Sequence, residues 1–245
     1  AVQSHWFAVG SLVPWAQAGV GAVATQSFID VRYGVRGLQL MEQGKPAGEA
    51  LKQLLAADSN PAVRQVGMID ADGNIAQHTG ENCIQHAGHL AGGNFAVQAN
   101  LMVVEGVPQA MAKAYEGARG PLAERLLSAL EAAEALGGDL RGKQSAAVLV
   151  VRGKPGEHPW DDRLVDLHVE DHPTPLAELR RLLTLHTAYR LMNLGDHSFE
   201  GGDIDGALAH YGQAGALVPD NLEMKFWHAV SLLNAGRVED AMPLF

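Results

Sequence analysis

Residues 137–151 read GGDLRGKQSAAVLVV, and this stretch sets the fold class of the first part of the chain. Gly137 and Gly138 end a predicted helix over residues 121–136, because glycine readily adopts the left-handed conformation that follows a helix C-terminus. The uninterrupted apolar run over residues 145–151 then predicts a strand that is buried on both faces. Polar groups at the mouth of such a strand are held rigidly and often line a cleft. We therefore expect the connecting loop to carry a site.

Apolar runs and turn signals on either side of this stretch predict a mixed domain. Asp72-Gly73, between two apolar runs, is typical of a tight hairpin turn. The order of strands, helices, strands, helices and strands indicates an α+β fold with mostly antiparallel pairing and not a regular βαβ series. Expected strands cover residues 1–4, 12–16, 21–25, 66–70, 75–78, 95–102, 145–151 and 164–170, and expected helices cover residues 33–43, 46–57, 108–116 and 121–136.

The C-terminal part is predicted to be helical from Leu176 onward. Thr174 and Pro175 are suited to the N-cap and first position of a helix. Gly202 and Gly236 lie 34 positions apart, which is the period of tetratricopeptide repeats. Three pairs of positions share that offset, namely Gly202 with Gly236, Ala207 with Ala241, and Tyr211 with Phe245.

These patterns predict two domains, one over residues 1–173 and a helical, tetratricopeptide-like module over residues 174–245. Two unrelated amphipathic hairpins are the alternative for the second. Its last hairpin stops within a helix at Phe245, and Ala1 starts within a strand, so we expect the natural chain to extend beyond both ends.

Composition narrows the classes of function. The net charge of -10 disfavours a protein that binds nucleic acid through phosphates. No apolar run is long enough to span a membrane. Cys83 is the only cysteine, so no internal disulfide can form, and a cytoplasmic setting is the simplest interpretation.

Two local motifs carry little functional information. The run from Gly19 to Ala24 is similar to a dinucleotide fingerprint, but no long helix follows it, so we predict no cofactor. A cluster of His78, Cys83, His86 and His89 could hold zinc. The glycine breaks within it favour hairpin histidines that bond backbone groups, and we predict no metal.

The loop after Gly138 and a neighbouring strand supply the polar candidates. Asp139 and Arg141 could pair with each other as a structural ion pair, clamp a carboxylate or orient an amide. Gln98 and Asn100 alternate on a predicted strand and could face one pocket, where an Asn amide can stabilise an oxyanion.

Separated segments over about residues 1–183 together resemble a bacterial and archaeal family of proteins of unknown function that is placed with the N-terminal-nucleophile hydrolases. The matching segments are residues 8–10, 13–16, 19–26, 33–34, 78–80, 87–89, 96–98, 137–147, 162–166 and 171–173. The resemblance implies a four-layer αββα sandwich of two antiparallel sheets between helices. His86 and Ala99 depart from the pattern, since relatives often carry an aromatic residue and a glycine there.

The resemblance also implies hydrolysis of a small amide. In such enzymes the first residue of the mature chain attacks with its side chain, and its own α-amine accepts the proton. Ala1 has no nucleophilic side chain, so we expect the nucleophile upstream of it; self-cleavage before Thr25 is the other source. The predicted catalytic residues are Asn100, Asp139, Arg141 and Ser145, and the predicted substrate-binding residues are Thr25, His78, Thr79, Gln98 and Gln144.

A non-enzymatic alternative uses the same domains. The α/β domain would then be a catalytically idle scaffold, and the helical repeats would bind a protein partner or pair two copies of the chain.

Overall fold

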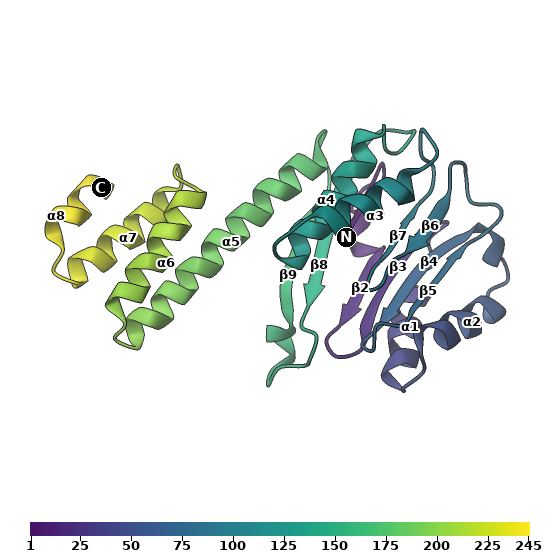
Figure 1. Cartoon of the computed structure of the whole chain (residues 1–245), viewed down its shortest axis with the longest axis horizontal. Coiled ribbons are helices and arrows are strands. Elements are labelled where there is room, and N and C mark those ends of the chain that lie inside the picture. The colour runs from purple at the N-terminus through teal and green to yellow at the C-terminus, as the bar shows by residue number, and fades with distance from the viewer. The chain divides into compact units, whose positions relative to one another are not determined.

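The computed structural model describes residues 1–245, and the chain divides into two compact units, Ala1–Leu179 and Arg180–Phe245 (Figure 1). The division falls inside one helix, a few residues beyond the expected boundary at residue 173. No helix is both long and apolar enough to cross a membrane.

Strands and helices alternate in groups through the first unit. Its strands are β1 Val2–Ser4, β2 Pro14–Gln17, β3 Gly21–Ser27, β4 Arg64–Asp70, β5 Ile75–Thr79, β6 Gly88–Ala91, β7 Ala96–Ala99, β8 Ser145–Val151 and β9 Arg163–Val169. Its helices are α1 Arg32–Glu42, α2 Ala47–Ala57, α3 Val107–Gly117 and α4 Leu122–Ala135, with short 3-10 turns η1 Val9–Ser11, η2 Pro61–Val63 and η3 Pro159–Asp162. The predicted α+β class is confirmed.

All strand pairs are antiparallel and form three sheets. Their orders are β2-β3-β4-β5, β1-β8-β9 and β6-β7. The Asp72-Gly73 turn joins β4 to β5 as predicted, and Gly73 takes a positive φ of 85° there. Asp70 fixes this turn, because its carboxylate accepts hydrogen bonds from the backbone N–H groups of Asp72 and Asn74.

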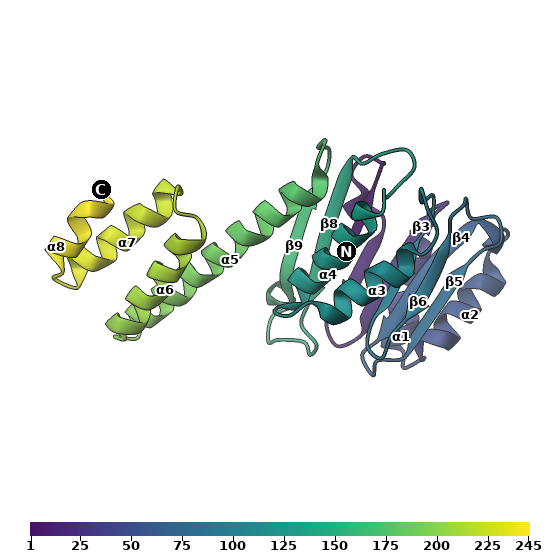
Figure 2. The same cartoon turned by 45° about the horizontal axis from the view of Figure 1, so that its top comes forward.

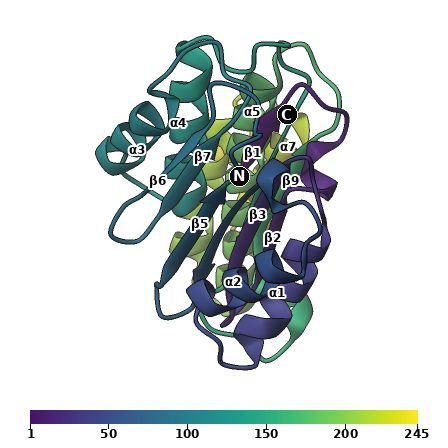
Figure 3. The ribbon, with the colours of Figure 1, turned by 90° about the vertical axis from the view of Figure 1, so that its right-hand side faces the viewer.

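Helices cover the strands on two sides (Figure 3). α1 and α2 pack on the four-stranded sheet, where Tyr33, Leu38 and Met41 of α1 meet buried side chains of β3 and β4 such as Val23 and Met68. α3 and α4 lie on the other side, in contact with each other and with β7 and β8 respectively (Figure 2).

The strand β8 is the centre of its sheet and matches its predicted range. It pairs with β1 on one edge and β9 on the other, and Ala146, Ala147 and Val148 are buried. Gly10 of η1 lies directly against it: a Cβ at Gly10 would fall 2.6 Å from the Cβ of Ala147 and 2.7 Å from Nδ1 of His168. The close approach of η1 to β8 therefore requires glycine at this position.

The expected strand over residues 95–102 is wrong at its end. β7 stops at Ala99, because Leu101 adopts a left-handed φ of 59° and Met102 makes a single bridge to Asp139. The partner strand β6 was not expected, since Gly88 and the Gly92-Gly93 pair in this segment argue against a strand from the sequence alone.

The second unit is helical, as predicted. It contains the C-terminal part of α5 Pro175–Glu200, followed by α6 Ile204–Leu217, α7 Leu222–Asn234, α8 Val238–Ala241 and a final turn, η4 Met242–Leu244. Asp203 and Asn221 cap α6 and α7 by accepting backbone hydrogen bonds. The ring of Tyr211 lies over Gly195, where a Cβ would come within 2.7 Å of it.

Candidate functional site

A cavity of about 590 Å³ opens in the first unit, between the sheets and beneath α3 and α4. Its apolar lining includes Val13, Val23, Met68, Phe95 and Leu130. Consecutive residues of β1 and of β7 line the cavity. Since successive side chains of a strand point to opposite faces, the cavity must border the edges of these strands as well as one face. Four of the predicted site residues also line it, namely Gln98, Asn100, Asp139 and Arg141.

Asp139 and Arg141 form a bidentate ion pair at the cavity. The guanidinium Nε donates to Oδ1 at 3.0 Å and Nη2 donates to Oδ2 at 2.6 Å. The loop is shaped by Gly137, Gly138 and Gly142, all with positive φ, and Asp139 bridges to Met102. The predicted pairing is thus present, and the bridge between Met102 and Asp139 holds the loop beside the segment that follows β7.

The Asp139 carboxylate stays ionised although it is buried. Burial by itself would raise the pKa of Asp139, but hydrogen bonds from the side chain and backbone of Arg141, together with its charge, outweigh burial and hold that pKa below the usual value. The backbone N–H of His5 also donates to Oδ2, at 3.3 Å. The pair therefore presents a fixed carboxylate next to the segment that follows β1.

A fully buried glutamine, Gln65 of β4, connects the candidates to the interior. Its amide nitrogen has three acceptors within 3.1 Å, namely Thr79 Oγ1 and the carbonyl oxygens of Ala99 and Gly88. Its amide oxygen accepts from Gln26 at 2.7 Å and Asn100 at 2.9 Å. Gln65 was not among the predicted site residues; its one local signal is its place directly before the run of residues 66–69 in β4, which has no polar side chain.

Two predicted hydroxyl groups form hydrogen bonds within the protein. Ser145 is buried, and its Oγ donates to the carbonyl oxygen of Trp6 and accepts from the backbone N–H of Val9 at 3.1 Å. Thr25, also buried, donates to the carbonyl oxygen of Asp30 at 3.3 Å. Neither lines the cavity, so the structure places both as anchors of nearby loops.

The remaining candidates also lie outside the cavity lining. Gln144 donates to the Asp171 side chain at 3.2 Å. A ring nitrogen of His78 lies 2.8 Å from the carbonyl oxygen of Pro61, and Thr79 Oγ1 lies 2.8 Å from Nδ1 of His89. Burial, with a smaller effect of His78, lowers the pKa of His89.

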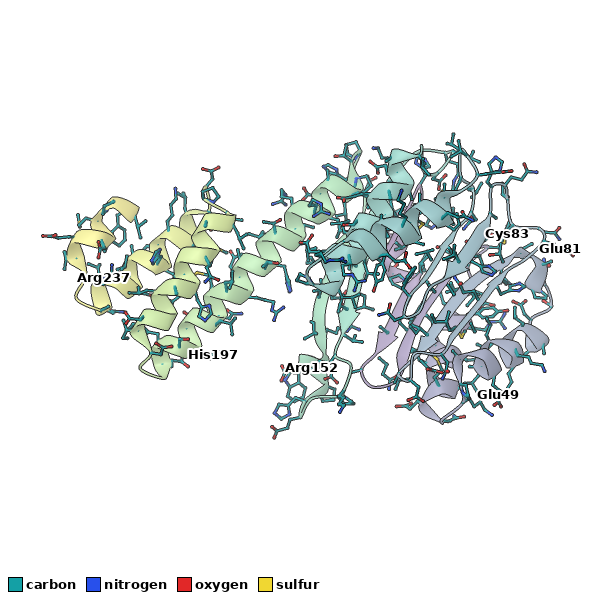
Figure 4. The ribbon with its side chains drawn as sticks, viewed as in Figure 1. Glu49, Glu81, Cys83, Arg152, His197 and Arg237 are labelled. Carbon is teal, nitrogen blue, oxygen red and sulfur yellow. The ribbon has the colours of Figure 1, made fainter.

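No three histidine, cysteine, aspartate or glutamate side chains gather as a metal site would require. His86 lies 3.5 Å from a carboxylate oxygen of Glu105, and Cys83 Sγ donates to the carbonyl oxygen of Arg64. Cys83 and Glu81 occupy the connection between β5 and β6 (Figure 4). The cluster noted in the sequence therefore does not converge on one point.

Comparison with known proteins agrees with this architecture. A model of the family of unknown function DUF1028 matches residues 1–179. The chain belongs to the DUF1028 family. The match covers the whole first unit, including every residue that lines the cavity.

A solved DUF1028 structure is similar to this one. The crystal structure of protein SPO2555 from Silicibacter pomeroyi superposes with a TM-score of 0.67 at 28% sequence identity, over 76% of this chain and 81% of that one. No curated protein matches the sequence. The DUF1028 description itself states no activity, so a function has to be argued from the site.

Proposed function

We propose that this protein hydrolyses a small amide by the N-terminal-nucleophile mechanism. The observation that carries the proposal is the ionised Asp139 carboxylate, which Arg141 holds at the edge of a cavity that Asn100 also lines. A carboxylate kept ionised in a buried place is suited to hold a terminal amine, and an Asn N–H is suited to an oxyanion.

The reaction would proceed in two steps. The side-chain oxygen or sulfur of the nucleophile attacks the amide carbon, while the α-amine of the same residue takes its proton. The C–N bond then breaks, the proton passes to the leaving nitrogen, and water hydrolyses the acyl intermediate. One N–H of Asn100 would donate to the developing oxyanion, and Asp139 would orient the amine.

The nucleophile in this proposal is the first residue of the mature protein, whose α-amine is the base. Two serines of the chain, Ser4 and Ser27, do line the cavity. The hydrogen-bond partner of Ser4 Oγ is Arg141, which donates to it at 3.4 Å and cannot act as a base. A terminal residue would bring its own base, which a serine in the middle of a chain lacks.

We also propose a specific architecture for each unit, an αββα sandwich for the first and tetratricopeptide-like repeats for the second. The helices on both sides of the strands in the first unit are consistent with the αββα sandwich of N-terminal-nucleophile hydrolases. In the second unit, Gly202 and Gly236 both take positive φ, and Ala207 and Ala241 are fully buried, as equivalent positions of tetratricopeptide repeats would be. With a single cysteine, we place the protein in the cytoplasm.

Release of ammonia or amine from a panel of small amides, by the protein with its natural N-terminus, tests the activity. Replacement of Asp139 by Asn should lower kcat by about 100-fold or more, because a neutral amide holds an ammonium poorly. Asp72→Asn, in the exposed β4–β5 turn, is the matched control and should leave kcat unchanged. Lack of turnover on every amide, or full activity of Asp139→Asn, would exclude the mechanism.

A second function, association through the helical unit, is favoured by exposed apolar side chains. Leu222 is 77% exposed, Phe245 64%, and Phe226 and Trp227 about half. Apolar groups this exposed are typical of a surface that binds a protein partner or a second copy. Sedimentation of the protein before and after removal of the second unit tests this, and an unchanged number of chains per particle would exclude self-association through the second unit.

A further inference from the structure

The orientation of the Gln65 amide is fixed by two backbone carbonyls. Its Nε2 lies 2.9 Å from the carbonyl oxygen of Ala99 and 3.1 Å from that of Gly88. A carbonyl oxygen only accepts hydrogen bonds, so the NH₂ group must face these two atoms. A flipped amide would set oxygen against oxygen. The amide oxygen of Gln65 therefore faces the opposite way.

This orientation determines those of Gln26 and Asn100. Their amide nitrogens lie 2.7 Å and 2.9 Å from Oε1 of Gln65. Since that oxygen needs donors, each neighbour gives it one N–H and keeps one N–H and one amide oxygen. Both residues line the cavity, so each has a donor and an acceptor left for a ligand.

Charged side chains in the cavity lining already have partners. Arg141 is paired with Asp139. Arg152, which directly follows β8 (Figure 4), donates from Nε to the backbone carbonyl oxygen of Asp161. Asp70 accepts from the backbone N–H of Ala47 at 2.9 Å. Each of these charged groups thus has a partner within the protein, which favours a neutral ligand over a carboxylate or phosphate.

Two buried polar atoms from the cavity lining lack a partner. One is an acceptor, Oε1 of Gln98, whose own Nε2 donates to the carbonyl oxygen of Ala24 at 3.2 Å. The other is a donor, Nε2 of Gln3. Unpaired buried polar groups are costly, so a partner for them would be stabilising. Like the free groups of Asn100 and Gln26, these two atoms are one donor and one acceptor.

We infer that the cavity binds a neutral molecule with a primary carboxamide, which pairs with the free edges of Asn100 and Gln26, and with an apolar tail. A carboxamide supplies both N–H and C=O, whereas a carboxylate brings only acceptors and an ammonium only donors. The apolar lining suits an alkyl chain. The inference rests on the proposed function in one respect: the bound amide would be the substrate.

Three probes of the same length separate these chemistries. Hexanamide, hexanoate and N,N-dimethylhexanamide are titrated into the protein, and binding is followed by NMR. Hexanamide should bind at least ten-fold more tightly than either of the others, because hexanoate lacks donors and would bury an unpaired charge, and the dimethyl amide lacks donors. Equal binding of the three probes, or binding of none, would overturn the inference.

Two variants test the residues. Asn100→Leu and Gln26→Met each replace an amide side chain by an apolar one of similar size. Each leaves the amide oxygen of Gln65 with one of its two donors. Each should weaken hexanamide about ten-fold and the dimethyl amide by less, because the dimethyl amide has only its carbonyl acceptor to lose a partner. Gln53→Met, on the exposed face of α2, is the control and should not alter binding. Unchanged hexanamide affinity in both site variants would overturn the assignment, and if they fail to fold, the probe series alone decides.

Binding and turnover are measured separately, so the two proposals can fail separately. Selective hexanamide binding without release of ammonia supports this inference and counts against the hydrolase. Amide hydrolysis with no binding preference for a primary carboxamide would support the hydrolase and count against this inference.

Discussion

The amide oxygen of Gln65 accepts a hydrogen bond from the side chain of Asn100 at 2.9 Å, across 35 positions of sequence. This contact joins β4 to the end of β7. Asn100 was predicted from the sequence as a site residue. Its orientation in the cavity is set by the buried Gln65, which was not predicted.

Removal of the Gln65 amide should destabilise the first unit strongly. In Gln65→Met the donors of Gln26 and Asn100 and two backbone carbonyls lose their partner, which we expect to cost about 2–4 kcal/mol of unfolding free energy. Urea unfolding measures this. A loss below about 0.5 kcal/mol would show that water replaces the amide.

Loss of the Ser145 hydroxyl should act on stability and not on ligand affinity. Ser145→Ala leaves the buried N–H of Val9 and the carbonyl oxygen of Trp6 unpaired, with an expected cost of about 1–3 kcal/mol. The control is Ser128→Ala, where the hydroxyl only bonds the Glu124 carbonyl within α4 and the change should be near zero. If Ser145→Ala abolished turnover in a fully stable protein, the hydroxyl would have a chemical role.

The Asp139–Arg141 pair predicts a pH dependence of stability. Because Arg141 holds the folded-state pKa of Asp139 below the ordinary value of 3.8, the contribution of Asp139 to stability is fully present above that value and is lost as the pH falls through the folded-state pKa. The difference in unfolding free energy between wild type and Asp139→Asn should thus be constant from about pH 5 to 7 and shrink below about pH 4. Unfolding in urea across this range measures it, and a difference that grows on acidification would contradict the pairing.

Packing in the helical unit depends on Gly195. Gly195→Ala would place a Cβ within 2.7 Å of the Tyr211 ring, and we expect a loss of about 1–3 kcal/mol. Gly212→Ala in α6 is the matched control, since no atom lies within 4 Å of the added Cβ. That variant should be stabilised by about 0.5–1 kcal/mol, because alanine favours a helix. Thermal unfolding followed by circular dichroism compares the two.

Sequence patterns predicted elements well where local signals are strong. The range of β8 was predicted to the residue, because seven consecutive small or apolar residues stand between a polar loop and a polar end. The helix that stops shortly before Gly137 and the Asp72-Gly73 turn likewise carry their own boundary signals. β6 has no such signal, since it depends on pairing with β7.

The candidate site was predictable only in part. Asp139 and Arg141 are two positions apart in one loop, so their pairing depends on local sequence and could be predicted from it. Ser145 and Thr25 were selected for their hydroxyl groups, but whether a hydroxyl faces a cavity or a backbone carbonyl depends on distant loops. The role of Gln65 needs residues from β3, β5, β6 and β7 to be brought together, which no short pattern encodes.

The contact of Gly10 with Ala147 and His168 leaves room for a fixed total side-chain volume between η1 and β8. During evolution, a larger residue at position 10 can therefore be accepted only with a smaller one at position 147 or a different ring position at 168. We expect these three positions to covary among relatives, and an alignment in which position 10 varies independently of the other two would contradict this close approach.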